Sequence, residues 1–165
     1  MVGIPSGSFW MGGEAETDEQ PVHTVRLSRP FWIGRNMVTQ AQWEYAAKAG
    51  EDYEYAGSDD PDTVAWSADN AEGEPHAVAG LAPGAWDVYD LSGNVWEWTG
   101  DGYDEDYYAQ SPEENPPGSS TTSSRVLRGG SWNDAPANVR VANRDGNSPD
   151  YRGGKLGFRL ARVGF

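Results

Sequence analysis

Hydrophobic and polar residues alternate at several places along the chain, with the period of two that is typical of a β-strand. The pattern predicts strands over Ile4–Met11, His23–Ile33, Val95–Trp98, Arg125–Trp132 and Leu156–Ala161. Each of these segments is short and is bounded by Gly, Pro, Asn, Asp or Ser, the residues that form turns. We therefore expect small sheets connected by many turns and irregular loops.

One segment has a helical pattern instead. Over Thr39–Gly50, Trp43 and Ala46 recur at the spacing of one helix face. Thr39 can cap the first turn, and Gln42 stands three residues later, where a capping box requires it. The segment ends on a glycine, which commonly stops a helix. We expect its apolar face to pack in the core rather than to bind a ligand.

The segment Arg125–Arg162 encloses polar loops between hydrophobic pieces. A short alternating piece with Val139 and Val141 separates the two loops, Asn133–Asn138 and Asp145–Lys155. Loops of this composition do not bury themselves, so the hydrophobic pieces should hold them at the surface. A frame that carries polar loops is typical of a binding site.

Composition limits the possible classes of protein. A length of 165 residues predicts one domain over 1–165, and 21 Gly and 11 Pro predict few helices. The absence of cysteine excludes disulfides, thiolate metal sites and a cysteine nucleophile. The sequence contains no run of about 18 apolar residues, so it predicts no membrane span. No signal peptide is visible at the N-terminus, and the sequence leaves the location of the protein open.

Charge is unevenly distributed along the chain. The net charge is −14, yet residues 125–165 hold eight basic and three acidic side chains, against four basic and 23 acidic in residues 1–124. Ion pairs between the two parts are one expectation, and binding of an anionic partner is the alternative. The overall negative charge argues against nucleic acid.

A turn over Asp90–Asn94 leads directly into the predicted strand that contains Glu97. Such a turn can direct backbone carbonyls inward, beside the carboxylate, and hard divalent cations such as calcium prefer this mixture of oxygen ligands. The alternative is that Glu97 serves as a buried hydrogen-bond acceptor.

Several motifs occur together in a recognisable order. IPSGSFWMG, PVHTVRLSRPFWIGRNMVTQAQWEYAA, AWDVYDLSGNVWEW, RVLRGGSW and LGFRLAR together resemble the formylglycine-generating-enzyme/sulfatase-modifying-factor family. The resemblance covers nearly the whole chain and implies a compact α+β, C-type lectin-like fold. Such a fold is irregular and loop-rich, with short antiparallel strands and few helices. One departure is that VTQAQ runs straight into WEYAA, where members of the family usually have more chain.

The chemistry of this family is not supported by the residues present. Its enzymes use a copper-binding pair of cysteines between the double glycine and the final GFR, and this chain has none. Cu(I) prefers such soft thiolates. The sulfoxide-synthase relatives use iron and several histidines, whereas only His23 and His76 occur here. We therefore expect no copper, no iron and no enzymatic activity; an oxidoreductase of the formylglycine-generating type, or a degenerate relative, is the alternative.

The C-terminal segment also resembles the variable proteins of diversity-generating retroelements. In these proteins a C-terminal stretch is rewritten at template adenines, often in AAC codons for Asn. Eight residues here differ from an all-Asn template, and all are reachable by changing the first two bases of AAC: Asp134, Ala135, Asp145, Gly146, Ser148, Tyr151, Gly153 and Gly154. Lys155 is not reachable in this way. The alternative is that these are ordinary loop residues.

The resemblance implies a ligand-binding segment over 125–162 in which side chains vary on a fixed frame. Trp132 and Arg140 would form the floor of the site, while Arg144 and Arg159 would hold the loops and Tyr151 would anchor the ligand. The predicted contact residues are Asn133, Asp134, Ala135, Asn143, Asp145, Gly146, Ser148, Tyr151, Gly153 and Gly154.

Two further expectations follow from the resemblance. A structural calcium ion would be bound by Asp90, Gly93, Val95 and Glu97, mostly through backbone carbonyls. The partner would be a protein ligand or surface receptor, and the chain itself could be displayed on a virus or cell surface through other proteins.

Overall fold

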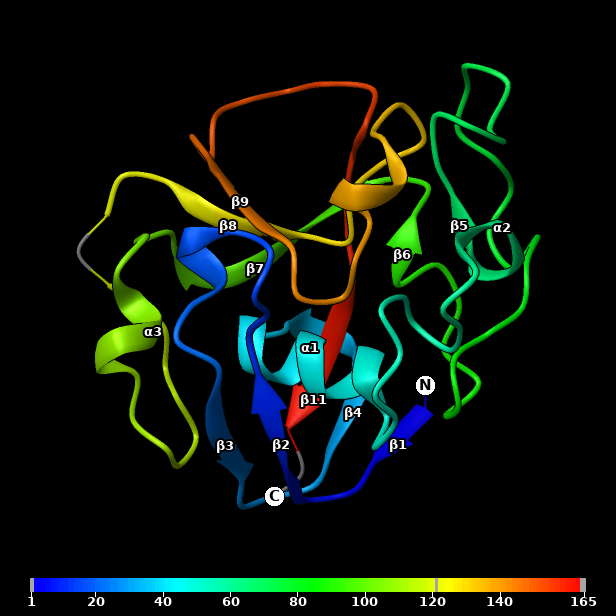
Figure 1. Ribbon diagram of the computed structural model, residues 1–165. Coiled ribbons are helices and arrows are strands. Elements are labelled where there is room, and N and C mark those ends of the chain that lie inside the picture. Colours follow the sequence, from blue (N-terminus) through cyan, green and yellow to red (C-terminus); the bar gives the residue numbers. More distant parts are fainter. Residues whose placement is uncertain (1, 121, 164–165) are drawn as a thin grey trace.

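The computed structural model describes residues 2–120 and 122–163, which form short strands, short helices and long connections (Figure 1). The helices are α1 Gln40–Lys48, α2 Pro61–Val64 and α3 Tyr107–Gln110, with 3-10 turns η1 Thr17–Glu19 and η2 Pro136–Asn138. The strands are β1 Val2–Ile4, β2 Gly7–Met11, β3 His23–Leu27, β4 Phe31–Met37, β5 Ala65–Trp66, β6 Ser92–Gly93, β7 Trp96–Gly102, β8 Arg125–Arg128, β9 Arg144–Asn147, β10 Leu156–Phe158 and β11 Leu160–Val163. The expected loop-rich α+β fold is confirmed. No helix within the described ranges is long and apolar enough to span a membrane.

The strands form four small sheets. One has the order β1-β4-β11 and one the order β10-β7-β8-β9, while β2-β3 and β5-β6 are isolated pairs. Most neighbouring strands are antiparallel, as expected, but β10 runs parallel to β7 and β5 runs parallel to β6. In Figure 1 the sheet of β7, β8 and β9 lies above α1, and β1, β4 and β11 lie below it.

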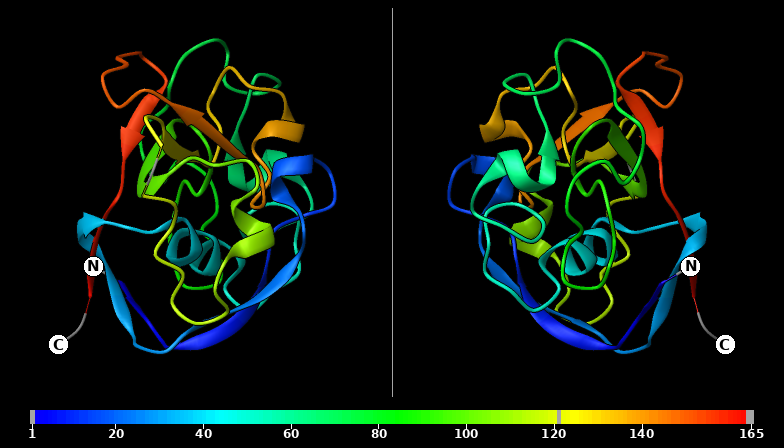
Figure 2. Two further views of the ribbon diagram at one scale, coloured as in Figure 1. Left: turned by 90° about the vertical axis from the view of Figure 1, so that its left-hand side faces the viewer. Right: turned by 90° about the vertical axis from the view of Figure 1, so that its right-hand side faces the viewer.

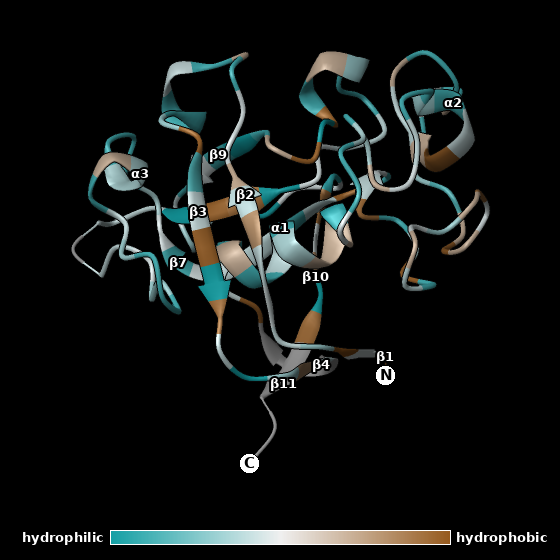
Figure 3. Ribbon diagram, turned by 60° about the horizontal axis from the view of Figure 1, so that its bottom comes forward, coloured by the Kyte–Doolittle hydropathy of each residue, from teal (hydrophilic) through white to brown (hydrophobic). Residues whose placement is uncertain are grey.

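Helix α1 packs at the centre of the molecule. Both hydrogen bonds of the capping box are present: Gln42 N donates to Thr39 Oγ1 (3.2 Å), and Thr39 N donates to Gln42 Oε1 (3.1 Å). The chain enters the left-handed region at Ala49 (φ 50°), one residue before the expected glycine. Trp43 is fully buried, which confirms that this face belongs to the core. Figure 3 shows the strands beside the helix, where hydrophobic and hydrophilic residues alternate along β3.

The two strands expected near the N-terminus are each divided in two. Ile4–Met11 breaks after Ile4, next to Pro5, so that β1 pairs with β4 while β2 pairs with β3. His23–Ile33 breaks at residues 28–30, where Pro30 precedes β4. Proline has no backbone N–H to donate to a strand ladder, which explains why both predicted strands were too long.

The C-terminal segment differs from the expectation at two places. Val139 and Val141 do not form an alternating strand, because Arg140 between them is buried as well and the backbone bends here. Arg144–Asn147, most of which was expected to be loop, is instead β9, which pairs antiparallel with β8. The segment predicted to bind a ligand therefore has more of its backbone in the sheet than the sequence indicated.

In the final predicted strand, the side chains that were expected to face the core face solvent instead. Phe158 is 69% exposed and Leu160 is 39% exposed, whereas Arg159 between them is partly buried. Arg159 faces inward and binds Glu97. The strand divides at this residue, because β10 pairs with β7 whereas β11 pairs with β4. The two side views show the last strands running down one flank, away from the loop that follows β9 (Figure 2).

Candidate binding site

A hollow of about 340 Å³ is lined by residues of β9 and of the connection from β9 to β10. This connection is the loop at the top of the molecule in Figure 1. Four of the predicted contact residues line it: Asp134, Asn143, Asp145 and Tyr151. The other lining residues are Trp96, Leu127, Asn138, Arg144, Asn147, Lys155 and Leu156. The first and last strands, β1 and β11, lie at the opposite end of the molecule. The predicted segment therefore does form a concave, predominantly polar surface.

Most of the other predicted contact residues are exposed beside this hollow rather than in it. Asn133, Ala135, Ser148, Gly153 and Gly154 are all exposed. Tyr151 lines the hollow and is still 43% exposed, so its ring is available as an anchor. A ligand that covers the hollow would also reach these surrounding positions.

Two of the predicted contact residues that line the hollow, Asp134 and Asn143, also hold the backbone of the site in place. Asp134 Oδ2 accepts hydrogen bonds from Trp96 Nε1 (2.8 Å) and from the backbone N of Ser131 (3.1 Å). Asn143 is 7% exposed, and its Nδ2 donates to the carbonyl of Asn138 at 2.7 Å. Substitution at either position would remove a bond that shapes the site.

The predicted floor residues lie elsewhere in the structure, since neither Trp132 nor Arg140 is among the lining residues. Arg140 instead binds the fully buried Glu19 through two bonds, of 3.0 and 2.8 Å. The base of the hollow is formed by its buried lining residues, among them Trp96 and Leu127. Both residues belong to strands of the sheet, so the base of the hollow is formed by the scaffold.

Arg144 holds the start of β9 in the way expected of it. Its guanidinium donates to the carbonyls of Asp18 (2.8 Å) and Asp104 (3.1 Å). It also lies over two rings, 4.9 Å from the centre of Tyr103 and 4.6 Å from that of Tyr108. Arginine suits this position because its planar group can donate several bonds and stack on aromatic rings together.

Arg128 is a structural residue that the sequence analysis did not single out. It is fully buried, pairs with the fully buried Glu44 of α1, and donates to the carbonyls of Val141 (2.8 Å) and Ala142 (2.9 Å). The only signal in the sequence was the position of Glu44, which directly follows Trp43 in the apolar pattern of the helix. A charge at such a position needs a partner when it is buried.

Three basic residues of the C-terminal segment pair with the acidic part of the same chain. Arg128, Arg140 and Arg159 each pair with a buried carboxylate there, while Lys155 lies 3.9 Å from Asp134 of its own segment. These contacts support the expectation of intramolecular ion pairs over that of an anionic partner.

Two of the four residues predicted to bind calcium, Asp90 and Glu97, are engaged in other contacts. Arg159 contacts both oxygens of Glu97, at 2.8 to 3.1 Å, and Trp43 Nε1 donates to Glu97 Oε2 at 2.8 Å. The side chain of Asp90 accepts from the backbone N of Ala79, and its carbonyl accepts from Arg159. Gly93 packs directly against the backbone of Trp66. Glu97 is thus a buried hydrogen-bond acceptor, the alternative considered above.

Fold and site together define a loop-rich, C-type lectin-like scaffold that presents a polar surface hollow. The chain belongs to the family of the sulfatase-modifying factor enzyme 1-like domain, whose model matches residues 1–43 and 32–163. It is 38% identical over 94% of its length to the formylglycine-generating enzyme of Streptomyces coelicolor, covering 58% of that protein. It is 36% identical over 79% of its length to the inactive C-alpha-formylglycine-generating enzyme 2 of Mus musculus, covering 44% of that protein. The chain thus spans only about half the length of these relatives.

Solved structures show the same fold. Treponema denticola variable protein 1 superposes with a TM-score of 0.73 at 32% identity, over 92% of this chain and 53% of that one. PvdO from Pseudomonas aeruginosa has a TM-score of 0.85 over 98% of this chain and 93% of its own. Its identity of 22% supports the fold alone.

Proposed function

We propose that this chain is a non-enzymatic ligand-binding protein whose segment 125–162 is diversified by a retroelement on a fixed scaffold. The observation that carries the proposal is that the arginines of the frame bind mainly to backbone carbonyl oxygens. Arg128, Arg144 and Arg159 each donate to two backbone carbonyls, and Arg128 and Arg159 also donate to a carboxylate outside the variable positions. Backbone carbonyls stay the same whatever side chain is present, so exposed residues can change without loss of these bonds.

The comparisons support a scaffold of this kind. One similar structure is a variable protein of Treponema denticola, and one relative is an inactive formylglycine-generating enzyme. The first is not named as an enzyme, and the second is named as an inactive one. The absence of cysteine in this chain agrees with that reading.

A protein surface is the ligand class that the site favours. The exposed residues around the hollow form a broad rim, which a folded partner could cover, and Tyr151 offers a large contact area with little conformational freedom to lose. Asn133, Ser148 and Asn147 add polar groups that can adapt to different partners.

The second candidate is an oxidoreductase of the formylglycine-generating type, because one relative at 38% identity carries that name. A copper-dependent assay with a cysteine-containing peptide separates the two functions. We expect no turnover, and oxidation of the peptide cysteine by the purified chain would overturn the proposal.

Two matched libraries test the binding surface. The first randomises the exposed positions Asn133, Ala135, Ser148, Tyr151 and Gly153, and the second randomises the buried positions Arg128, Asn143 and Arg144. We expect most members of the first library to fold and to yield binders against several unrelated proteins, whereas most of the second should not fold. If the first library collapses as often as the second, the exposed loops are structural and the proposal fails.

The gene tests the origin of the diversity independently. A neighbouring reverse transcriptase and an adenine-rich copy of the 3′ end would support the retroelement. Codons at the predicted variable positions that do not mostly end in a pyrimidine would contradict it.

A further inference from the structure

Tyr103 lies beside the predicted variable segment but outside it, immediately after β7. Its hydroxyl donates to Asp18 Oδ2 at 2.8 Å, and its backbone N donates to the carbonyl of Ser124 at 3.0 Å. The Arg144 guanidinium lies 4.9 Å from the centre of its ring. These contacts fix the ring against the start of β9.

The ring also borders a second hollow, of about 280 Å³. Asn138, Asn143 and Arg144 line both this hollow and the first one, so the two are adjacent. The position of Tyr103 therefore affects the surface beside the candidate binding site.

Gly146 of β9 lies directly under this ring. A Cβ atom added at Gly146 would be 2.5 Å from Cδ1 and 2.7 Å from Cβ of Tyr103, and closer still to its Cγ. Real Cβ atoms essentially never come within 3.0 Å of such neighbours. Because the overlap is with the base of the ring, rotation of the ring alone does not relieve it.

Packing is the reason why glycine is needed here. Gly146 pairs with Val126 in the sheet and is not among the residues with positive φ, so its backbone conformation suits any residue. The contrast with other predicted variable glycines is clear, because a Cβ added at Gly154 meets nothing within 4 Å. Of these two glycines, only Gly146 is coupled to a residue of the scaffold.

We infer that the residue at position 146 sets the position of the Tyr103 ring and makes Tyr103 a specificity-determining residue of the binding surface. With glycine at 146, the ring lies over β9 and bonds to Asp18. Any larger side chain at position 146, including the Asn of an all-Asn template, displaces the ring and changes the shape of the second hollow. A change at the variable position 146 thereby alters the position of Tyr103, which is not itself varied. The biological meaning of this inference rests on the proposed function.

Nitration of tyrosine by tetranitromethane, located by peptide mass spectrometry, tests this inference without any ligand. Burial, followed by the hydrogen bond to Asp18, raises the pKa of Tyr103, and the reagent requires the phenolate. We expect Gly146→Asn to speed nitration of Tyr103 by about tenfold, the effect of one pKa unit on the phenolate fraction. The matched control Gly154→Asn should leave the rate unchanged.

The outcomes separate this inference from the proposed function. Equal nitration rates at Tyr103 in folded Gly146→Asn and in the parent would overturn it, whether or not the chain binds a protein. If Gly146→Asn does not fold, the double variant with Tyr103→Ala decides: recovery of folding supports the steric coupling, and failure to recover overturns it.

Discussion

The guanidinium of Arg128 donates to the carboxylate of Glu44, and both side chains are completely inaccessible to solvent. The pair connects β8 to the central helix, while the other bonds of Arg128 hold the backbone of Val141 and Ala142. One ion pair thus determines how the helix, the sheet and the entry to β9 fit together. Burying two charges is costly, so such a pair indicates specificity of structure more than stability.

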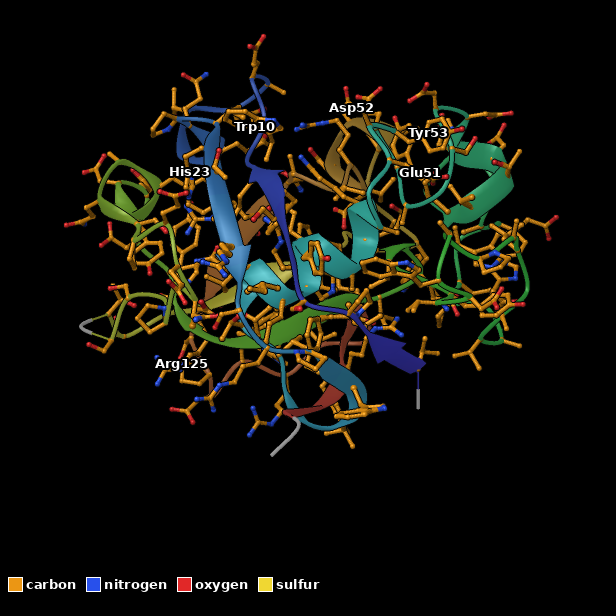
Figure 4. All side chains as sticks on the ribbon, turned by 90° about the horizontal axis from the view of Figure 1, so that it is seen from below. Trp10, His23, Glu51, Asp52, Tyr53 and Arg125 are labelled. Atoms are coloured by element: carbon orange, nitrogen blue, oxygen red, sulfur yellow. The ribbon has the colours of Figure 1, made fainter. Side chains whose placement is uncertain are left out.

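Removal of one partner of this pair should destabilise the protein severely. We expect Arg128→Met to lower the free energy of unfolding by roughly 3–5 kcal/mol, because Glu44 would be left buried without its cation. Urea denaturation measures the change. Arg125→Met is the matched control on the same strand: Arg125 is only partly buried and lies toward the edge of the molecule, away from Asp52 and Tyr53 (Figure 4). A similar loss in both variants would contradict the prediction.

Positions predicted to vary should differ in their tolerance of substitution. Asn143→Ala removes a partly buried hydrogen bond to the Asn138 carbonyl and should cost about 0.5–1.5 kcal/mol, the typical net contribution of such a bond. Ala135→Asn places a polar group at an exposed position and should change stability by less than about 0.5 kcal/mol. Thermal or urea unfolding of the two variants provides the comparison, and equal effects would show that burial does not govern tolerance here.

Asp101 should make stability depend on pH in the mildly acidic range. Burial raises the pKa of Asp101 to about 6, from 3.8, although a hydrogen bond from the backbone of Gln40 partly opposes the shift. The folded state therefore binds this proton more tightly than the unfolded state, and the associated stability is lost as pH rises from about 4 to about 6.

The Asp101→Asn variant isolates this contribution. Its stability relative to the parent should increase between pH 4 and pH 7 by up to about 3 kcal/mol, the free energy of a shift of about two pKa units. The exposed Asp145→Asn serves as the control. Parallel pH profiles for the parent and Asp101→Asn would refute the prediction.

Calcium should not stabilise the protein, because Arg159 occupies the carboxylate of Glu97. Melting temperatures in excess calcium and in a chelator should therefore agree. Binding to the folded state alone would instead raise stability by about 2.7 kcal/mol at a concentration 100 times the Kd. A calcium-dependent rise that is lost in Asp90→Asn would restore the calcium role that the family resemblance implied.

The sequence predicted the parts of the structure that depend on local pattern. The capped helix α1 needed only Thr39, Gln42 and the apolar spacing, and the loop-rich fold followed from the motifs and the turn residues. The same reasoning placed Asp145 and Tyr151 on one surface. The helix depends on residues that are close together along the chain, whereas the fold and the site were predicted from motifs spread over nearly its whole length.

The remaining features could not be predicted, because they depend on contacts between distant residues. Arg159 faces inward only because Glu97 lies on the neighbouring strand, and a period-two pattern does not reveal such a partner. Likewise, the requirement for glycine at Gly146 comes from the ring of Tyr103, 43 positions earlier. The order of the strands decided both outcomes.

The contacts between η1 and the two arginines Arg140 and Arg144 also affect when the chain can complete its folding during synthesis. Arg140 binds Glu19 from 121 positions away, and Arg144 binds the carbonyl of Asp18 from 126 positions away. At ribosomal rates of about 5–20 residues per second, the turn at η1 waits roughly 6–25 s for its arginine partners to be synthesised. Such distant pairings also slow folding. Until Arg140 and Arg144 are synthesised, the buried carboxylate of Glu19 therefore lacks its cation and the carbonyl of Asp18 lacks its donor.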